Sequence, residues 1–226
     1  MAEKIVLDNV GVTVNGPDGP EPVLRNVSAA IGEGEMVAVV GPSGSGKTTL
    51  LNVVGGLEPS FQGTVLIDGR SVWTSPEAAR AKIRGERIGF VFQESNLIAG
   101  LSAEENLALP LLLAPHVSQP PRERTRTLLA RVGMQDKARI RAERLSGGER
   151  QRVATARALV AGPDIVLVDE PTGNLDDETG RRVIEILLEY RTERRATMLI
   201  ATHDARLMER ADRILQLLDG TLHADE

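Results

Sequence analysis

Gly41-Pro42-Ser43-Gly44-Ser45-Gly46-Lys47-Thr48, followed by Thr49, is the stretch that decides the fold of this chain. It matches the pattern G-x-x-x-x-G-K-[ST] at every fixed position. The apolar segment Met36–Val40 comes before it and predicts a buried parallel strand. The segment Thr49–Val54 comes after it and predicts the opening of a helix. A strand, a glycine-rich loop and a helix in this order predict a phosphate-binding loop.

Each part of this phosphate loop (Gly41–Thr48) suits the binding of a nucleotide. Glycine lets backbone N–H groups curl around a polyphosphate, and the helix N-terminus adds the positive end of its dipole. Lys47 is predicted to reach the β- and γ-phosphates, and the Thr48 hydroxyl is predicted to ligate Mg²⁺. The loop and Thr49 are therefore candidate cofactor-binding residues, and Lys47 is also a candidate catalytic residue.

Composition limits the other possibilities. The 226 residues suffice for one large domain, and the net charge of −5 without a dense basic stripe argues against nucleic acid as a partner. The absence of cysteine excludes disulfides and thiolate metal sites. The start, Met1–Asp8, shows no apolar core of a signal peptide. The most apolar run, Leu107–Ala114, is far shorter than the roughly 20 residues that span a bilayer. Any membrane role is therefore expected to come through a partner.

The order of the remaining patterns predicts an α/β fold. An early pair of strands joined by the turn-rich loop 15–22 suggests a small antiparallel sheet beside a parallel core, and the proline-interrupted helical pattern from about 102 to 160 suggests an inserted helical lobe. Strands are predicted at residues 5–14, 23–31, 36–40, 63–69, 88–93, 165–170, 197–202, 213–218 and 221–222. Helices are predicted at residues 49–54, 75–84, from 102 onward, 146–159, 177–194 and 204–210.

The segment Ile165–Glu170 predicts the second half of the nucleotide site. Its four apolar residues predict a central strand that ends in Asp169, a candidate Mg²⁺ ligand. Glu170 is expected on the opposite side of the pleat, where it would polarise the water that attacks the γ-phosphate. Taken alone, the same pattern also fits a strand that merely ends in two solvated acids.

The segment Leu145–Leu159 contains a second candidate anion site. Ser146 and Glu149 have capping-box spacing and predict the start of a long helix. Gly147 and Gly148 leave bare N–H groups that an anion can approach, although glycine costs about 1 kcal/mol relative to alanine inside a helix. The chain therefore contains two helix N-termini suited to phosphate.

The signature loop (Leu145–Glu149), the phosphate loop and the Asp169-Glu170 strand together resemble the motifs of ATP-binding-cassette (ABC) ATPases, over nearly the whole chain. The resemblance implies that Gln93 contacts Mg²⁺ and relays to a membrane partner, that Gly173–Asp176 is the D-loop with Asp176 near the nucleotide, and that His203 contacts the γ-phosphate. It implies a P-loop NTPase core with a mainly parallel sheet, an antiparallel β subdomain and an inserted α-helical subdomain. The expected division of this single domain is roughly 1–93 with 161–226 for the core and β subdomain, and roughly 94–160 for the helical subdomain.

The resemblance further implies how such a chain works. Two copies would associate head to tail around two ATP, so that Ser146 and Gly148 of one copy hold the γ-phosphate bound by Lys47 of the other. The dimer would dock on integral-membrane permease subunits at the cytoplasmic face of the cell membrane and couple ATP hydrolysis to export or extrusion. Segments such as Gly89–Gln93 and Glu170–Asp176 are typical of the lipoprotein-release and macrolide-export branch.

The chain departs from the family pattern in two places. Val14 stands where an aromatic residue usually stacks on adenine, which predicts a weaker preference for ATP over GTP. Glu149 stands where glutamine is commoner, and it is expected to be tolerated because it preserves the helix cap.

Three alternatives fit less well. A non-transport ABC ATPase of DNA repair would need a long coiled-coil insertion, and an ABC protein of translation would need two cassettes in one chain. A binding module that has lost catalysis would not need Lys47, Asp169, Glu170 and His203 together.

Overall fold

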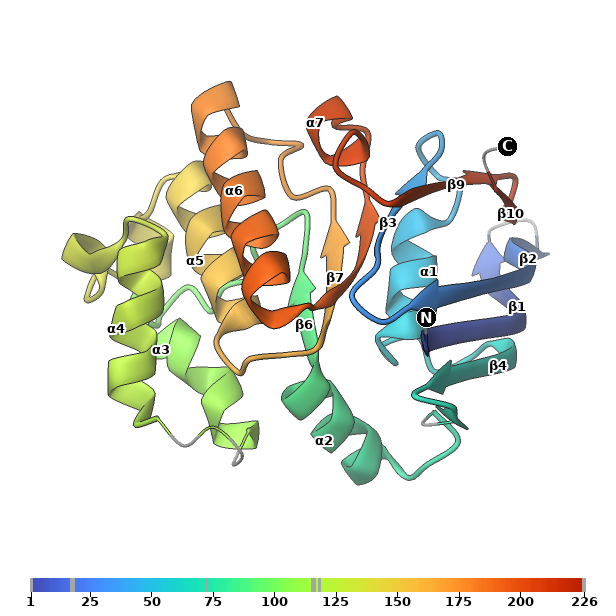
Figure 1. Ribbon diagram of the computed structural model, residues 1–226, viewed down its shortest axis with the longest axis horizontal. Coiled ribbons are helices and arrows are strands. Elements are labelled where there is room, and N and C mark those ends of the chain that lie inside the picture. Colours follow the sequence, from blue (N-terminus) through green and yellow to red (C-terminus); the bar gives the residue numbers. More distant parts are fainter. Residues whose placement is uncertain (1, 17–18, 72, 115–116, 118, 225–226) are drawn as a thin grey trace. The chain divides into compact units, whose positions relative to one another are not determined.

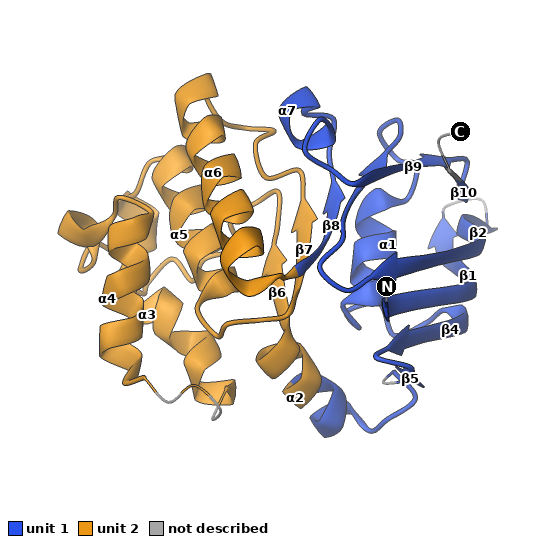
Figure 2. Cartoon of the chain, in the orientation of Figure 1, with its two compact units in different colours: residues 1–81, 197–226 blue, residues 82–196 orange. Residues whose placement is uncertain are grey.

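The computed structural model describes residues 2–16, 19–71, 73–114, 117 and 119–224. These residues form two compact units, which Figure 2 shows in blue and orange. Unit 1 comprises residues 1–81 and 197–226, and unit 2 comprises residues 82–196. Helix α2 (Glu77–Arg87) contains the boundary between them.

Unit 1 contains an antiparallel sheet of four strands in the order β2-β1-β4-β5 (Figure 1). Its strands are β1 (Glu3–Gly16), β2 (Gly19–Gly32), β4 (Gln62–Ile67) and β5 (Arg70–Ser71). Ile5 is fully buried and lies opposite Ile31 on one side and Ile67 on the other. The early hairpin that the sequence predicts is confirmed.

The extent of the loop predicted at residues 15–22 is wrong. Strand β1 continues to Gly16 and β2 begins at Gly19, while residues 17–18 lie outside the described part of the chain. Pro20 and Pro22 belong to β2 and face Asn15 and Thr13 of β1. The reason is that β2 is an edge strand of this sheet, where proline can occupy positions whose missing N–H would point to solvent.

Unit 1 also holds a mixed sheet in the order β10-β9-β3-β8. Its strands are β3 (Met36–Val40), β8 (Thr197–Ala201), β9 (Arg213–Leu218) and β10 (Thr221–Ala224). Strands β8 and β9 run parallel to β3, and β10 closes an antiparallel hairpin with β9. Strand β8 is buried along its whole length, as expected for a parallel strand with both faces covered. The helices of this part are α1 (Lys47–Val54) and α7 (Ala205–Met208).

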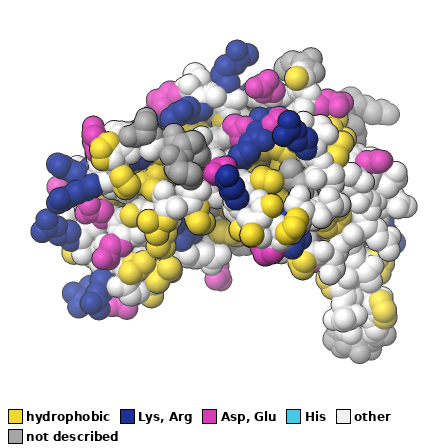
Figure 3. Space-filling view, turned by 90° about the horizontal axis from the view of Figure 1, so that it is seen from below, with side chains coloured by type: hydrophobic (Ala, Val, Ile, Leu, Met, Phe, Trp, Pro, Cys, Tyr) yellow, Lys and Arg dark blue, Asp and Glu magenta, His cyan; other side chains and the backbone are white. Residues whose placement is uncertain are grey.

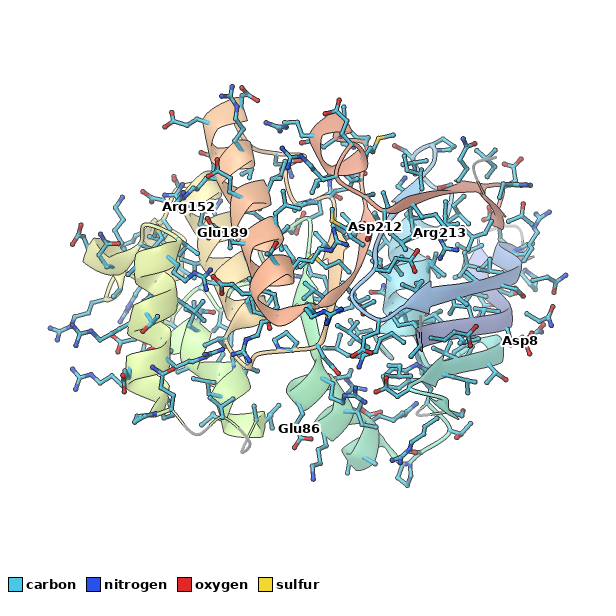
Figure 4. All side chains as sticks on the ribbon, in the orientation of Figure 1. Asp8, Glu86, Arg152, Glu189, Asp212 and Arg213 are labelled. Carbon is cyan, nitrogen blue, oxygen red and sulfur yellow. The ribbon has the colours of Figure 1, made fainter. Side chains whose placement is uncertain are left out.

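Two side chains fix the start of β9 beside β3, and Figure 4 labels both. Asp212 Oδ2 accepts a hydrogen bond from the Met36 N–H at 2.8 Å. Arg213 donates to the Ala30 carbonyl at 2.6 Å and forms an ion pair with Glu35 at 3.0 Å. This end of β3 is therefore held in register, so that its other end delivers the phosphate loop.

Unit 2 combines two parallel strands with a group of helices. The strands are β6 (Ile88–Val91) and β7 (Ile165–Asp169), and every residue of β7 is buried. The α-helices are α3 (Ala103–Ala108), α4 (Pro121–Arg131), α5 (Gly147–Leu159) and α6 (Asp177–Arg194). Short 3₁₀ turns lie between them as η1 (Leu109–Leu113), η2 (Gln135–Lys137) and η3 (Ala142–Arg144).

The helix starts follow the local sequence signals. Both predicted capping boxes are present, Ser102 with Glu105 at α3 and Ser146 with Glu149 at α5. Helix α6 has the bounds that the sequence predicts, whereas α2 runs to Arg87 rather than to about residue 84. An α/β fold with a mixed and an antiparallel sheet is confirmed.

The face shown in Figure 3 carries Lys and Arg side chains interspersed with Asp and Glu, with apolar side chains between them. Among the described residues, no helix is both long and apolar enough to cross a membrane.

Candidate nucleotide-binding site

The phosphate loop joins β3 to α1 in unit 1. Gly46 is the N-cap of α1 with φ 100°, a left-handed conformation that favours glycine. A Cβ at Gly46 would also lie 3.0 Å from the Val23 carbonyl oxygen, and a Cβ at Gly41 would collide with the Leu217 carbonyl oxygen. Glycine is therefore required at both ends of this loop. Neither position has room for a Cβ, and Gly46 also has a left-handed conformation.

Two polar side chains of the loop are placed for an anion. Lys47 Nζ donates to the carbonyl oxygens of Gly41 at 2.8 Å and Pro42 at 3.0 Å, so the ammonium lies over the loop. Ser45 is 7% exposed, and its Oγ makes no hydrogen bond within the described part of the chain. A buried hydroxyl without a partner is costly, which fits a loop built to receive a further polar group.

His203 lies at the same sheet edge as the phosphate loop. Strands β3 and β8 are parallel neighbours, and the Thr202 N–H donates to the Val39 carbonyl at 3.2 Å. His203 is exposed, and Asp204 after it accepts hydrogen bonds from Arg206 and caps α7. Because the carboxyl ends of parallel strands meet at one edge, unit 1 brings His203 and the loop to the same side.

Unit 2 brings Gln93, Asp169 and Glu170 to one sheet edge in the same way. Gln93 follows β6 and is exposed, and Asp169 ends the neighbouring strand β7 with 5% exposure. A Cβ built on Gly173 would lie 3.8 Å from both Gln93 Nε2 and Glu170 Cβ. A side chain at this position of the D-loop would thus contact both side chains.

The prediction that Glu170 lies across the pleat of β7 from Asp169 is wrong. Strand β7 ends at Asp169, and Glu170 has φ 41°. Side chains alternate between the two faces of a sheet only along an extended backbone. Glu170 has a left-handed conformation just after the strand, so the alternation does not apply to it. Such a conformation costs about 1–3 kcal/mol in a residue other than glycine and clusters at functional sites.

A cavity of about 470 Å³ lies beside these residues within unit 2. It joins three motifs that are far apart in the sequence, namely the segment after β6, the signature loop with the first turns of α5, and the D-loop. The lining residues are Gln93, Glu94, Ser95, Asn96, Leu97, Gly147, Arg150, Gln151, Pro171, Asn174 and Leu175.

The N-terminus of α5 presents the signature loop. Ser146 and Gly147 are exposed, and a Cβ on Gly147 would meet no heavy atom within 4 Å. Glu149 Oε2 accepts from the Ser146 N–H at 3.0 Å, and Ser146 Oγ accepts from the Glu149 N–H at 3.4 Å. The cap is thus closed by side chains while the glycine N–H groups remain open to a ligand.

Glu149 carries a charged carboxylate. Lys137 Nζ donates to Glu149 Oε1, and this bond, followed by the one from the Ser146 N–H, holds the pKa of the Glu149 carboxyl below its ordinary value. The sequence reasoning missed Lys137, since it lies in the turn η2 and belongs to no motif.

Two side chains of α5 that the sequence reasoning also missed hold the segment around Gln93. Gln151 is 4% exposed, and its Nε2 donates to the Phe92 carbonyl at 2.9 Å. Arg157 donates to the Asn96 carbonyl at 2.6 Å and the Ser95 carbonyl at 3.0 Å. Burial lowers the pKa of the Arg157 guanidinium. Neither contact follows from a motif or a spacing rule, because each joins α5 to a segment far away in the sequence.

Asp176 acts as the N-cap of α6. Its Oδ1 accepts from the Thr179 N–H at 2.9 Å, and this bond is the largest cause that lowers the pKa of its carboxyl. The side chain therefore already has a structural partner, whereas the preceding D-loop residue Asn174 lines the cavity.

The predicted metal ligands are chemically suited to Mg²⁺. Thr48, Gln93 and Asp169 supply a hydroxyl, an amide and a buried carboxylate, all of them oxygen donors. Mg²⁺ is usually bound through one or two carboxylates together with substrate phosphates and water. The described residues contain no cluster of three or more His, Cys, Asp or Glu that could hold a metal ion.

Comparisons with known proteins bear on the family of the chain. Residues 24–173 match the family described as ABC transporter. The chain is 42% identical over 226 residues to the lipoprotein-releasing system ATP-binding protein LolD of Pseudomonas fluorescens, covering 99% of this chain and 100% of that protein. It is 47% identical over 202 residues to LolD 1 of Caulobacter vibrioides, covering 88% of this chain and 86% of that protein.

Solved structures share the fold of the chain. A dimeric ATP-binding cassette, MJ0796, in a post-hydrolysis state with ADP and Pi is 38% identical, with a TM-score of 0.92 and coverage of 98% of this chain and 97% of that one. The structure of cbiO1 from Clostridium perfringens, part of the complex cbiONQ, is 27% identical with a TM-score of 0.81, covering 99% of this chain and 88% of that one.

Proposed function

The chain belongs to the ABC transporter family, as an ATP-hydrolysing subunit of the lipoprotein-release branch, and from this premise we propose that two copies close head to tail around two ATP to drive a separate membrane permease. One observation carries the proposal. The described chain has two helix N-termini that open on glycine, α1 at the phosphate loop and α5 at the signature loop. A single nucleotide needs one such loop for its phosphates, and a second copy gives the other loop a role.

We assign each residue of the site a role in ATP hydrolysis. Lys47 and the loop N–H groups bind the β- and γ-phosphates, and His203 donates to the γ-phosphate. Thr48, Gln93 and Asp169 would hold Mg²⁺, which neutralises charge on the phosphate oxygens. Glu170 orients the attacking water and accepts its proton.

The signature loop of the second copy completes this site. Ser146 and the N–H groups of Gly147 and Gly148 would bind the γ-phosphate held by the other copy, and Glu149 keeps the cap closed. Asp176 fixes the start of α6 behind the D-loop. Catalysis then rests on positioning and charge stabilisation, since phosphoryl transfer offers little covalent chemistry to the protein. The cassette with ADP and Pi is dimeric, which supports this arrangement.

Glu170→Gln tests the assignment of the base. We expect this variant to form an ATP-dependent dimer in sedimentation experiments, with turnover reduced about 10²–10⁴-fold as for the loss of a general base. Glu143→Gln is the matched control, because Glu143 is an exposed glutamate in η3. Normal hydrolysis by Glu170→Gln would refute the role of Glu170, and a hydrolysis-deficient Glu170→Gln that stays monomeric with ATP would refute the head-to-tail dimer.

We also propose that permease subunits hold this chain at the cytoplasmic face of the cell membrane, without nucleic acid as a partner. The division into a core with β subdomain (roughly 1–93 and 161–226) and a helical subdomain (roughly 94–160) belongs to the same proposal. Affinity purification of the chain from its native membranes tests the partner. Recovery of an integral-membrane permease is expected, and recovery with DNA or ribosomes would contradict it.

A further inference from the structure

The side chain of Lys137 forms a contact that the ATPase mechanism above does not use. Its Nζ donates to Glu149 Oε1, and the other oxygen of that carboxylate accepts from the Ser146 N–H at 3.0 Å. The Glu149 side chain is 18% exposed and the Lys137 side chain 49%. The Glu149 carboxylate therefore links the ammonium of Lys137 to the Ser146 N–H of the signature loop.

The negative charge of Glu149 would repel a phosphate that approaches the N-terminus of α5. The N-terminus of α5 favours one anion through its dipole and its free N–H groups. Glu149 is the only acidic residue in the first turn of α5, and it already places one negative charge there. A glutamine at this position would close the same capping box without the charge. The carboxylate therefore needs a counter-charge if the loop is also to bind a phosphate.

Lys137 is the cation placed to supply that counter-charge. Arg150, the next basic residue along α5, donates instead to the Leu145 carbonyl at 2.7 Å. The backbone of Lys137 is fixed on both sides, since its N–H donates to the Met134 carbonyl at 3.1 Å and its own carbonyl accepts from the Ile140 N–H at 2.9 Å. The lowered pKa of Glu149, with Lys137 as the largest cause, agrees with a carboxylate that stays charged and paired.

We propose that Lys137 is a positioning residue of the ATP sandwich, which neutralises Glu149 so that the signature loop can accept the γ-phosphate bound by a second copy. The assignment rests on the proposed function, because the loop meets a phosphate only in the head-to-tail dimer. It concerns affinity across the dimer rather than the chemical step, so it predicts a change in dimerisation and in the KM for ATP at constant kcat.

A double-mutant cycle with a non-hydrolysable ATP analogue tests the assignment. Sedimentation equilibrium gives the dimer dissociation constant of the parent, Lys137→Met, Glu149→Gln and the double variant. We expect Lys137→Met to weaken binding about threefold at each loop and therefore about tenfold per dimer, the size of an exposed ion pair acting twice. Glu149→Gln should dimerise at least as tightly as the parent, and the double variant should match Glu149→Gln. Lys137→Arg should retain the parent value.

Controls separate this role from folding. Lys82→Met removes an equal charge from the Lys82–Glu86 pair of α2 and should leave dimerisation unchanged. The melting temperature of Lys137→Met should stay near that of the parent, since the Ser146–Glu149 cap remains and a half-exposed side chain leaves no cavity. A dimer of Lys137→Met as tight as the parent, or a double variant as weak as Lys137→Met, would overturn the assignment alone. A parent that stays monomeric would overturn the proposed function and the assignment with it.

Discussion

Replacing Gly148 by alanine tests how closely α5 and α6 approach at the signature loop. A Cβ at Gly148 would lie 2.7 Å from Thr179 Cγ2 and 3.2 Å from Thr179 Oγ1, well inside the roughly 3.5–4.0 Å at which carbon atoms pack best. A Cβ at the neighbouring Gly147 would meet no heavy atom within 4 Å. The same substitution at two adjacent residues of one helix therefore separates packing from helix propensity.

The expected magnitudes follow from these distances. Overpacking costs about 1–3 kcal/mol, whereas alanine gains up to about 1 kcal/mol over glycine in a helix. We expect Gly148→Ala to destabilise the chain by about 1 kcal/mol, which lowers the melting temperature by about 2–4 °C for a chain of this size. Gly147→Ala should be neutral or stabilising by up to about 1 kcal/mol.

Differential scanning calorimetry of both variants provides the measurement. Thr179→Ser removes Cγ2 but keeps the backbone N–H that caps against Asp176, so it should recover most of the loss in the Gly148→Ala background. Equal melting temperatures for Gly148→Ala and Gly147→Ala, with no recovery from Thr179→Ser, would refute the packing argument.

Three further predictions concern other parts of the chain. Arg157→Lys should destabilise the chain by about 1–3 kcal/mol in urea unfolding and speed the hydrogen exchange of residues 93–97, because an ammonium cannot replace the guanidinium that binds two loop carbonyls. Unchanged hydrogen exchange would count against this prediction. Val14 is 40% exposed, so Val14→Tyr has room to stack on a nucleotide base and should tighten ATP binding about fivefold or more, whereas an unchanged affinity would show that Val14 does not face the base; competition with GTP then tests the selectivity that the sequence predicts. The pKa of Glu193 is lowered by its hydrogen bond from Arg131, so the stability from this pair is present above the unfolded pKa of about 4.3 and lost as pH falls through the folded value. Glu193→Gln should accordingly reduce the loss of melting temperature between about pH 6 and pH 3, and an unchanged loss would assign the acid sensitivity to other carboxylates.

Most of the fold was predicted from sequence patterns that span only a few residues. The capping boxes at Ser102 and Ser146, the glycine-rich loop and the apolar strand segments all act over a few residues, and each has its expected structure. The loop at residues 15–22 was predicted too long because proline lacks an N–H donor and is therefore taken to break a strand. At the edge of a sheet that donor is not needed, and the sequence does not show which strands lie at an edge.

The parts of the site that escaped prediction depend on contacts between distant residues. The Lys137–Glu149 pair and the grip of Arg157 on residues 95–96 join separate segments through side chains, and no spacing rule encodes them. Glu170 was assigned by strand alternation, but its left-handed backbone is decided by the turn that follows β7. Motifs thus identified the residue types of the site, while tertiary packing fixed their geometry.

The hydrogen bonds of Lys47 have a consequence for nucleotide affinity. The ammonium donates two of its three N–H groups to the carbonyl oxygens of Gly41 and Pro42, so only one N–H group is left for a phosphate unless these internal bonds are exchanged. Each further bond from Lys47 to the phosphate replaces a bond to a loop carbonyl, and only the difference between phosphate and carbonyl as acceptors then adds to the affinity. The carbonyl oxygens of the loop thus compete with the phosphate for the Lys47 ammonium, which lowers the affinity that this residue adds to nucleotide binding.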